Sequence, residues 1–168
     1  MTEKTTPWTA AGGAGAAGAL SAGGGTPGTG TLPPEARSAE GARDQVTVRL
    51  PAESAYLSVL RTATAGLAAR LDFTLDEIED LRIAVDEACA MLLAEADEGS
   101  SLQCEFTLSR DTMTIAVSAQ SRLGQPPAKD TFAWTVLSAL AGSVDSVVGP
   151  GDQVTIVLRK SRGLTGSG

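Results

Sequence analysis

Histidine is absent from this chain of 168 residues. Histidine is the commonest general base, the commonest zinc ligand and the phosphoacceptor of a sensor histidine kinase, so its absence excludes several reaction classes. Cysteine is scarce: Cys89 and Cys104 each lie in an apolar periodic stretch, which provides neither a disulfide framework nor zinc-ligand spacing. We interpret both as buried core thiols in a reducing compartment.

Long apolar runs and clusters of basic residues are also missing. No run approaches the roughly 20 residues that span a bilayer, and the N-terminus lacks the features of a signal peptide. We therefore expect a soluble, cytoplasmic protein without membrane contact. The formal net charge of -7 argues against direct nucleic-acid binding and favours a protein partner.

Large apolar residues are rare near both ends of the chain, where Gly, Ala, Thr, Pro and Ser dominate. Such segments bury too little surface to offset their ordering entropy. We predict a disordered arm over residues 1–43, a single domain over 44–161 and a disordered tail over 162–168. Trp8 is an isolated aromatic in the arm, either a short docking motif or, more commonly, an incidental residue.

Hydrophobic periodicity predicts the elements of the domain. Period-two alternation indicates strands, and apolar residues three and four apart indicate helices, the first with a stripe at Tyr56, Leu60, Ala63, Leu67 and Leu71. The expected order is a strand at 45–50, helices at 52–71 and 74–96, a hairpin at 102–117 turning at 110–111, a helix at 131–142 and a hairpin turning at 149–152. Thr74 and Glu77 form a capping-box pattern at the second helix. We predict an α/β fold, a two-layer sandwich of a mostly antiparallel sheet with helices on one face.

The segment from Tyr56 to Ala90 resembles the first two helices of RsbW-like anti-sigma factors, most specifically in DEIEDLRIAVDEACA at 76–90. These proteins are serine-protein kinases with the GHKL, or histidine-kinase-like, ATPase fold. The resemblance implies that fold across residues 45–160. It also implies sequestration of an alternative sigma factor in stress-response partner switching, with release by an anti-anti-sigma (STAS-type) protein. Relatives commonly dimerise, and the strand at 45–50 offers an edge that a second copy could cover.

The magnesium site of that family is altered in this sequence. In the family, a Glu acts as base, and an Asn four residues later, on the same helix face, ligates magnesium. The matching positions are Glu87 and Met91. Magnesium requires hard oxygen donors, and a thioether is too soft to serve. We therefore expect the metal site to be lost.

The nucleotide-binding turns of the family are altered as well. The Asp-x-Gly whose carboxylate reads adenine is replaced by Ala119-Gln120-Ser121, and the Gly-x-Gly that admits the phosphates is replaced by Thr131-Phe132-Ala133. The segment 122–130 is shorter than the nucleotide lid of active relatives. These differences predict that ATP and magnesium do not bind.

Several residues have two interpretations. Glu87 is either a surviving base or, as we favour, an acidic residue on a solvated helix face; Gly124 is a relic of the nucleotide loop or ordinary turn chemistry. Phe132 and Trp134 either bind a partner or fill the space that adenine would occupy. We favour the filling role. Arg61 lies where relatives present an arginine to sigma, or is an exposed solubilising residue. The acidic run 76–80, with Asp86, is a solvated face or complements basic surfaces of a sigma factor.

These patterns leave three functional hypotheses. The first is a non-catalytic anti-sigma factor that negatively regulates transcription. The second is an active ATP-dependent serine kinase that phosphorylates an anti-anti-sigma factor, with Glu87 as base and with ATP and magnesium bound. The third is an interaction module with no sigma partner.

Overall fold

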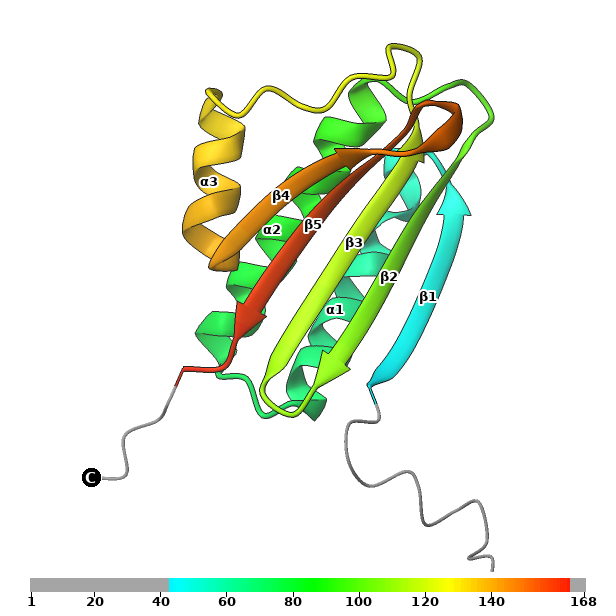
Figure 1. The fold of residues 1–168 in the computed structure, drawn as a ribbon. Coiled ribbons are helices and arrows are strands. Elements are labelled where there is room, and N and C mark those ends of the chain that lie inside the picture. Colours follow the sequence, from blue (N-terminus) through cyan, green and yellow to red (C-terminus); the bar gives the residue numbers. More distant parts are fainter. Residues whose placement is uncertain (1–42, 164–168) are drawn as a thin grey trace, which may run out of the picture. The chain divides into compact units, whose positions relative to one another are not determined.

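Residues 43–163 are described by the structure, a computed structural model, and they form an open sheet with helices against one face (Figure 1). The strands are β1 (Asp44–Pro51), β2 (Ser101–Ser109), β3 (Thr112–Gln120), β4 (Ser143–Val148) and β5 (Gln153–Ser161). The α-helices are α1 (Leu57–Arg70), α2 (Leu75–Ala94) and α3 (Phe132–Ala141), and short 3-10 helices occur at η2 (Ser54–Tyr56) and η3 (Pro150–Asp152). Trp8, the predicted arm before residue 43 and the predicted tail beyond residue 163 lie outside the described residues.

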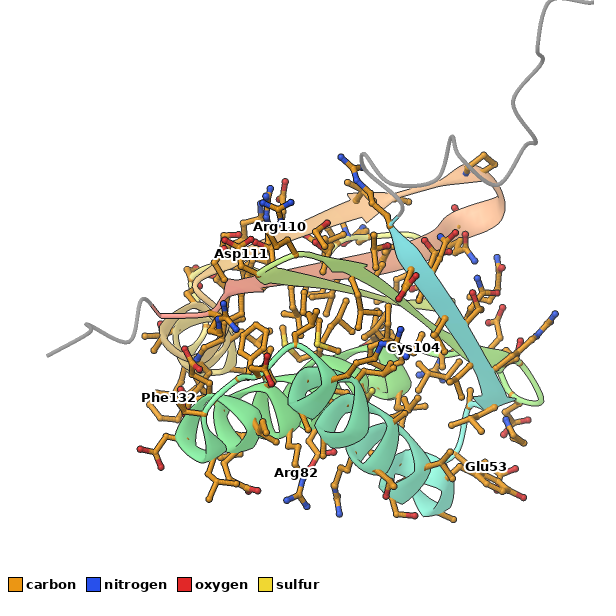
Figure 2. The ribbon with its side chains drawn as sticks, turned by 90° about the horizontal axis from the view of Figure 1, so that it is seen from below. Glu53, Arg82, Cys104, Arg110, Asp111 and Phe132 are labelled. Carbon is orange, nitrogen blue, oxygen red and sulfur yellow. The ribbon has the colours of Figure 1, made fainter. Side chains whose placement is uncertain are left out.

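The sheet has the strand order β1-β2-β3-β5-β4, and every neighbouring pair is antiparallel. Tight turns join β2 to β3 and β4 to β5, because antiparallel neighbours need only a short connection. β1 and β4 are the two edges. The predicted two-layer α/β sandwich with helices on one face is confirmed (Figures 1 and 2).

The core lies between the sheet and the helices, where Figure 2 shows a continuous layer of side chains that includes Cys104. Alternate residues of the three central strands point into it: Leu102, Cys104, Phe106 and Leu108 on β2, Met113, Ile115, Val117 and Ala119 on β3, and Val154, Ile156 and Leu158 on β5. Cys89 of α2 is buried in the same layer. Burial, reinforced by the nearby charge of Asp86, raises the pKa of the Cys89 thiol to about 12. Both cysteines are therefore the buried core thiols that the sequence predicted.

The apolar stripe of α1 differs from the predicted one. The residues it buries are Leu57, Leu60, Thr64 and Ala68, whereas the predicted Ala63, Leu67 and Leu71 pack only partly against the core. Tyr56 is 41% exposed because it precedes the first turn of the helix as its N-cap. Thr64 is tolerated in the core since its hydroxyl donates to the Leu60 carbonyl at 2.7 Å.

The start of α2 has the capping box expected from the sequence. The Thr74 Oγ1 accepts from the Glu77 N–H, and the Glu77 carboxylate accepts from the Thr74 N–H at 2.8 Å. That carboxylate also accepts from the backbone N–H of Gly163 at 2.7 Å, so the chain beyond β5 is held against α2. Burial alone raises the pKa of Glu77, but the hydrogen bonds from Gly163 and Thr74 and the charge of Lys160 bring it below its ordinary value. Within residues 43–163, no helix has the length and apolarity that crossing a membrane requires.

Candidate functional site

A cavity of about 420 Å³ lies where α2 and β3 end and α3 begins. It brings together all five positions at which the sequence departs from the nucleotide-binding pattern. These positions are Met91, Ala119, Ser121, Thr131 and Ala133.

Each of these positions is fixed by the end of a secondary-structure element. Met91 lies in the last turn of α2 and is half-buried, while Ala119 is the buried penultimate residue of β3. Ser121 follows β3 and forms an isolated antiparallel bridge to Ala96, which draws the end of β3 to the end of α2. On the opposite side, Thr131 is the N-cap of α3, and its Oγ1 accepts from the Trp134 N–H.

The loop after β3 forms the remaining wall of the cavity. Its lining residues are Leu123, Gln125, Pro126, Pro127 and Ala128. Gly124 has a φ of 59°, and a Cβ at this position would collide with the Asp152 carboxylate, so the residue performs the turn role favoured for it. The wall itself was missed at the sequence level, although the apolar composition of Leu123-Gly124-Gln125-Pro126-Pro127 was a usable signal.

The cavity lining is mainly apolar, and its single charged residue is the acidic Glu95. Two cations near the loop are already paired within the domain. The guanidinium of Arg122 lies 3.9 Å from the Glu95 carboxylate, and the Lys129 ammonium donates to Asp145 at 2.8 Å while lying 5.4 Å from the centre of the Trp134 ring. The hydrogen bonds from Lys129 and from the Ser146 N–H lower the pKa of the Asp145 carboxyl. No lining residue therefore supplies a positive charge for a polyphosphate.

Proteins with sequences similar to this chain are serine-protein kinases of the RsbW type. RsbW of Halalkalibacterium halodurans is 39% identical over 80 residues, which are 47% of this chain and 49% of that protein. RsbW of Bacillus subtilis is 33% identical over 78 residues, which are 45% of this chain and 49% of that protein. The chain is RsbW-like.

The fold agrees with this likeness. A crystal structure of the RsbU and RsbW domains of a Mycobacterium tuberculosis protein superposes with a TM-score of 0.55 at 13% identity, covering 71% of this chain and 34% of that one. The described domain thus shares the fold of that RsbW domain. No protein-family model matches the chain, and the alignments span about half the length of the curated relatives it matches.

The predicted base and the predicted metal-ligand position of the RsbW-like domain differ in their surroundings, because only the second of them lines the cavity. Glu87 is half-buried on α2 one turn before Met91, and it is not among the residues that line the cavity. At Met91 a thioether faces the cavity. Among residues 43–163, no three acidic or cysteine side chains gather in a group that could hold a metal ion. This donor set does not fit magnesium, which binds several oxygen ligands.

Phe132 and Trp134 do not share the filling role predicted for them. Trp134 is 7% exposed and packs in the core but does not line the cavity, whereas Phe132 is 84% exposed. The prediction is wrong for Phe132 because the first residue of α3 projects away from the sheet while the third faces it.

Arg61 lies outside the cavity, on the solvent side of α1. Its Nε donates to Asp86 Oδ2 of α2 at 2.5 Å, and the two side chains are 44% and 32% exposed. The neighbouring acidic run is partly paired within the domain, since Glu79 bonds Arg82 and Asp80 bonds Lys160. The surface of α1 and α2 therefore keeps Arg61 accessible, but as one half of an ion pair.

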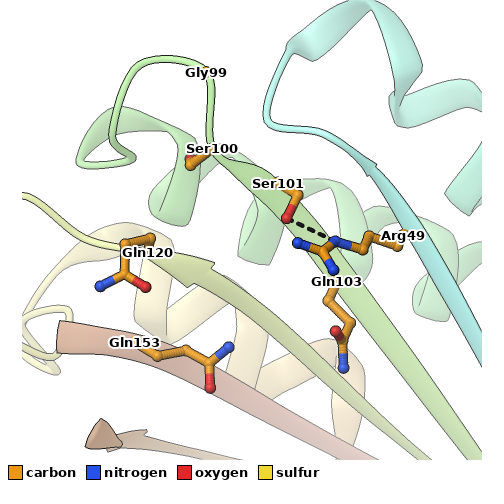
Figure 3. A pocket seen from close by; sticks show the side chains of 7 residues that line it. All are labelled: Arg49, Gly99, Ser100, Ser101, Gln103, Gln120 and Gln153. Carbon is orange, nitrogen blue, oxygen red and sulfur yellow. Dashed lines mark hydrogen bonds between the residues drawn. The ribbon is translucent and has the colours of Figure 1, made fainter. Parts of the chain in front are cut away.

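A second hollow, of about 470 Å³, lies on the open face of the sheet (Figure 3). Polar side chains surround it, with Gln103, Gln120 and Gln153 on adjacent strands and Arg49 donating to Ser101 Oγ at 2.9 Å. No pattern in the sequence indicated a function for these residues. Gln120 faces this hollow although its neighbours Ala119 and Ser121 line the apolar cavity, because successive strand residues point to opposite faces.

Proposed function

We propose that this chain is a non-catalytic anti-sigma factor that sequesters an alternative sigma factor in the cytoplasm and so represses transcription. The observation that supports the proposal is the apolar, cation-free lining of the cavity at the nucleotide position. A triphosphate carries several negative charges and binds where backbone N–H groups, cations and a metal neutralise them. Here the one charge is that of Glu95, and Met91 stands at the metal-ligand position.

Sigma capture then depends on the outer surface of the domain rather than on its cavity. Arg61 of α1 is accessible and lies at the position that the resemblance assigns to sigma contact. The acidic side chains around α2 complement a basic partner surface. Release follows when a STAS-type anti-anti-sigma protein competes for an overlapping surface.

We further propose that β1 pairs with β1 of a second copy. β1 is an edge strand with its outer backbone groups unpaired within the described sheet, and an isologous antiparallel pairing would satisfy them in both copies. Light scattering across a dilution series measures this directly. A constant monomer mass at high micromolar concentration contradicts the pairing.

Two measurements test the main proposal. Isothermal titration with ATP and magnesium is expected to give no heat of binding, with RsbW of Bacillus subtilis as the positive control. Co-purification with candidate sigma factors is expected to succeed equally with and without nucleotide.

The kinase alternative makes the opposite prediction in both assays. Micromolar ATP affinity, together with phosphorylation of a partner serine that Glu87→Gln abolishes, would establish it. A pull-down from the cytoplasm of the cells that produce this protein, with no sigma factor in the bound fraction, would favour the interaction-module alternative.

A further inference from the structure

We propose that the cavity between α2, β3 and α3 binds a small, uncharged, mostly apolar molecule that carries a hydrogen-bond acceptor. The inference rests on the proposed loss of nucleotide binding at the same site. It goes further, because it assigns the cavity a ligand class of its own.

The size and walls of the cavity support a ligand site. Its volume of about 420 Å³ falls in the range typical of small-molecule pockets, roughly 300–1,000 Å³. The floor is formed by Leu92, Ala119 and Val154, which are 4%, 2% and 2% exposed and belong to the packed core. A rigid apolar floor gives an apolar ligand close contact without reorganisation of the protein.

One polar group in the cavity has unused hydrogen-bonding capacity. Ser121 is 7% exposed, and its Oγ accepts from the N–H groups of Leu123 at 3.2 Å and Gly124 at 3.3 Å. These bonds occupy both lone pairs of the hydroxyl, and within residues 43–163 its O–H has no acceptor. Thr131 differs, since its hydroxyl donates to the Ala128 carbonyl at 3.1 Å. The Ser121 O–H therefore selects for an acceptor on the ligand.

The charge pattern selects for a neutral molecule. An anion would meet Glu95 and no free cation, and it would lose its hydration on entering an apolar space. A cation would compete with Arg122, which already lies 3.9 Å from the Glu95 carboxylate. Neither sign of charge gains enough to offset its desolvation.

The test uses two neutral fluorescent probes on the full chain. Prodan has an apolar naphthalene body and a ketone acceptor, and its emission moves to shorter wavelength in apolar surroundings. 2-Dimethylamino-6-propylnaphthalene is the matched ketone-free probe, because it has a methylene group in place of the carbonyl and keeps the same apolar chain. We expect saturable 1:1 binding of prodan, roughly threefold to tenfold tighter than the ketone-free probe, as the net value of one hydrogen bond implies. Ser121→Ala should abolish that difference between the probes.

A pair of matched variants locates the site. Ala133→Phe fills the cavity from α3 and is expected to eliminate prodan binding, whereas Ala139→Phe, on the same helix but outside the cavity, should leave it unchanged. Thermal unfolding checks that both variants fold. If Ala133→Phe does not fold, Met91→Trp closes the same space from α2.

Three outcomes overturn the inference. They are the absence of saturable prodan binding, prodan binding that survives filling of the cavity in a folded variant, and equal affinity for the two probes in the unsubstituted chain. Displacement of prodan by ATP with magnesium overturns the proposed function as well. Failure of both prodan and ATP to bind overturns this inference alone and leaves the anti-sigma proposal standing.

Discussion

The ion pair between Arg61 and Asp86 allows the role of Arg61 to be tested by a double-mutant cycle. Arg61 of α1 supplies the side-chain hydrogen bond to Asp86 of α2, and the other carboxylate oxygen of Asp86, Oδ1, is buried without a partner among the described residues. Removal of Arg61 therefore leaves a half-buried carboxylate unpaired. The variants required are Arg61→Ala, Asp86→Ala and the combination of both.

The expected stability effects follow from this geometry. A partly exposed ion pair contributes about 0.5–1 kcal/mol, and an unpaired carboxylate oxygen adds up to about 1 kcal/mol to the cost of losing its partner. Arg61→Ala should thus destabilise the domain by about 1–1.5 kcal/mol, which lowers the melting temperature by roughly 3–8 °C. Asp86→Ala should cost less, because it also removes the unsatisfied oxygen. The coupling energy should be about 0.5 kcal/mol or more.

Sigma affinity then separates direct contact from a structural role. If Arg61 touches sigma, Arg61→Ala should weaken capture by about tenfold or more, the value of a charged hydrogen bond. Asp86→Ala releases the guanidinium and should leave capture unchanged or tighter. Surface plasmon resonance well below the melting temperatures measures both. Equal loss in the two single variants, with no further loss in the double variant, would refute direct contact.

Three further predictions concern stability and reactivity. Gly124→Ala should destabilise the domain by about 1–2 kcal/mol, because the φ of Gly124 is 59° and a Cβ would meet the Asp152 carboxylate. Gly66→Ala, on the exposed side of α1 with open space around it, should stabilise the domain by up to about 1 kcal/mol. Urea unfolding of the two variants measures both changes. The lowered pKa of Glu77 gives stability that is present above its ordinary value of 4.5 and is lost as the pH falls through the folded-state pKa, so Glu77→Gln should lower the melting temperature at pH 7 by an amount that shrinks as the pH falls below 4.5. Cys89 and Cys104 should resist a thiol-specific reagent at pH 8 until guanidinium unfolds the chain, and rapid labelling of the native protein would contradict their burial.

The strands and α2 were predictable because their patterns are strong. Alternation on β2, β3 and β5 is strict, since one face of each strand is buried and the other is open. The phase of α1 was not predictable, because this helix is rich in alanine and threonine, and its small side chains fit several rotations about the helix axis. Its start at Leu57 instead of Ala52 removed Tyr56 from the stripe.

The candidate site was predictable only where the resemblance supplied positions. Residues at 91, 119, 121, 131 and 133 are distant in sequence, and no periodicity links them, yet the ends of three elements bring them to one cavity. The loop wall and the exposure of Phe132 escaped prediction, because loops have no repeating pattern and the rotation of a short helix depends on how its first turn docks. The hollow around Gln103, Gln120 and Gln153 depends on strand order, which periodicity does not determine.

The buried position of Ala119 implies that nucleotide binding cannot be restored residue by residue. Ala119→Asp would place the missing adenine-reading carboxylate at a side chain that is 2% exposed, next to apolar neighbours and without a cation, at a cost of about 3 kcal/mol in unfolding free energy. Ala116→Asp, on the same strand but facing the open side of the sheet, should cost less than about 1 kcal/mol even opposite Glu105. Urea unfolding of both variants measures the difference. Equal costs would mean that the cavity is already hydrated and polar enough to accept a carboxylate, which would contradict both an apolar ligand and the loss of ATP binding.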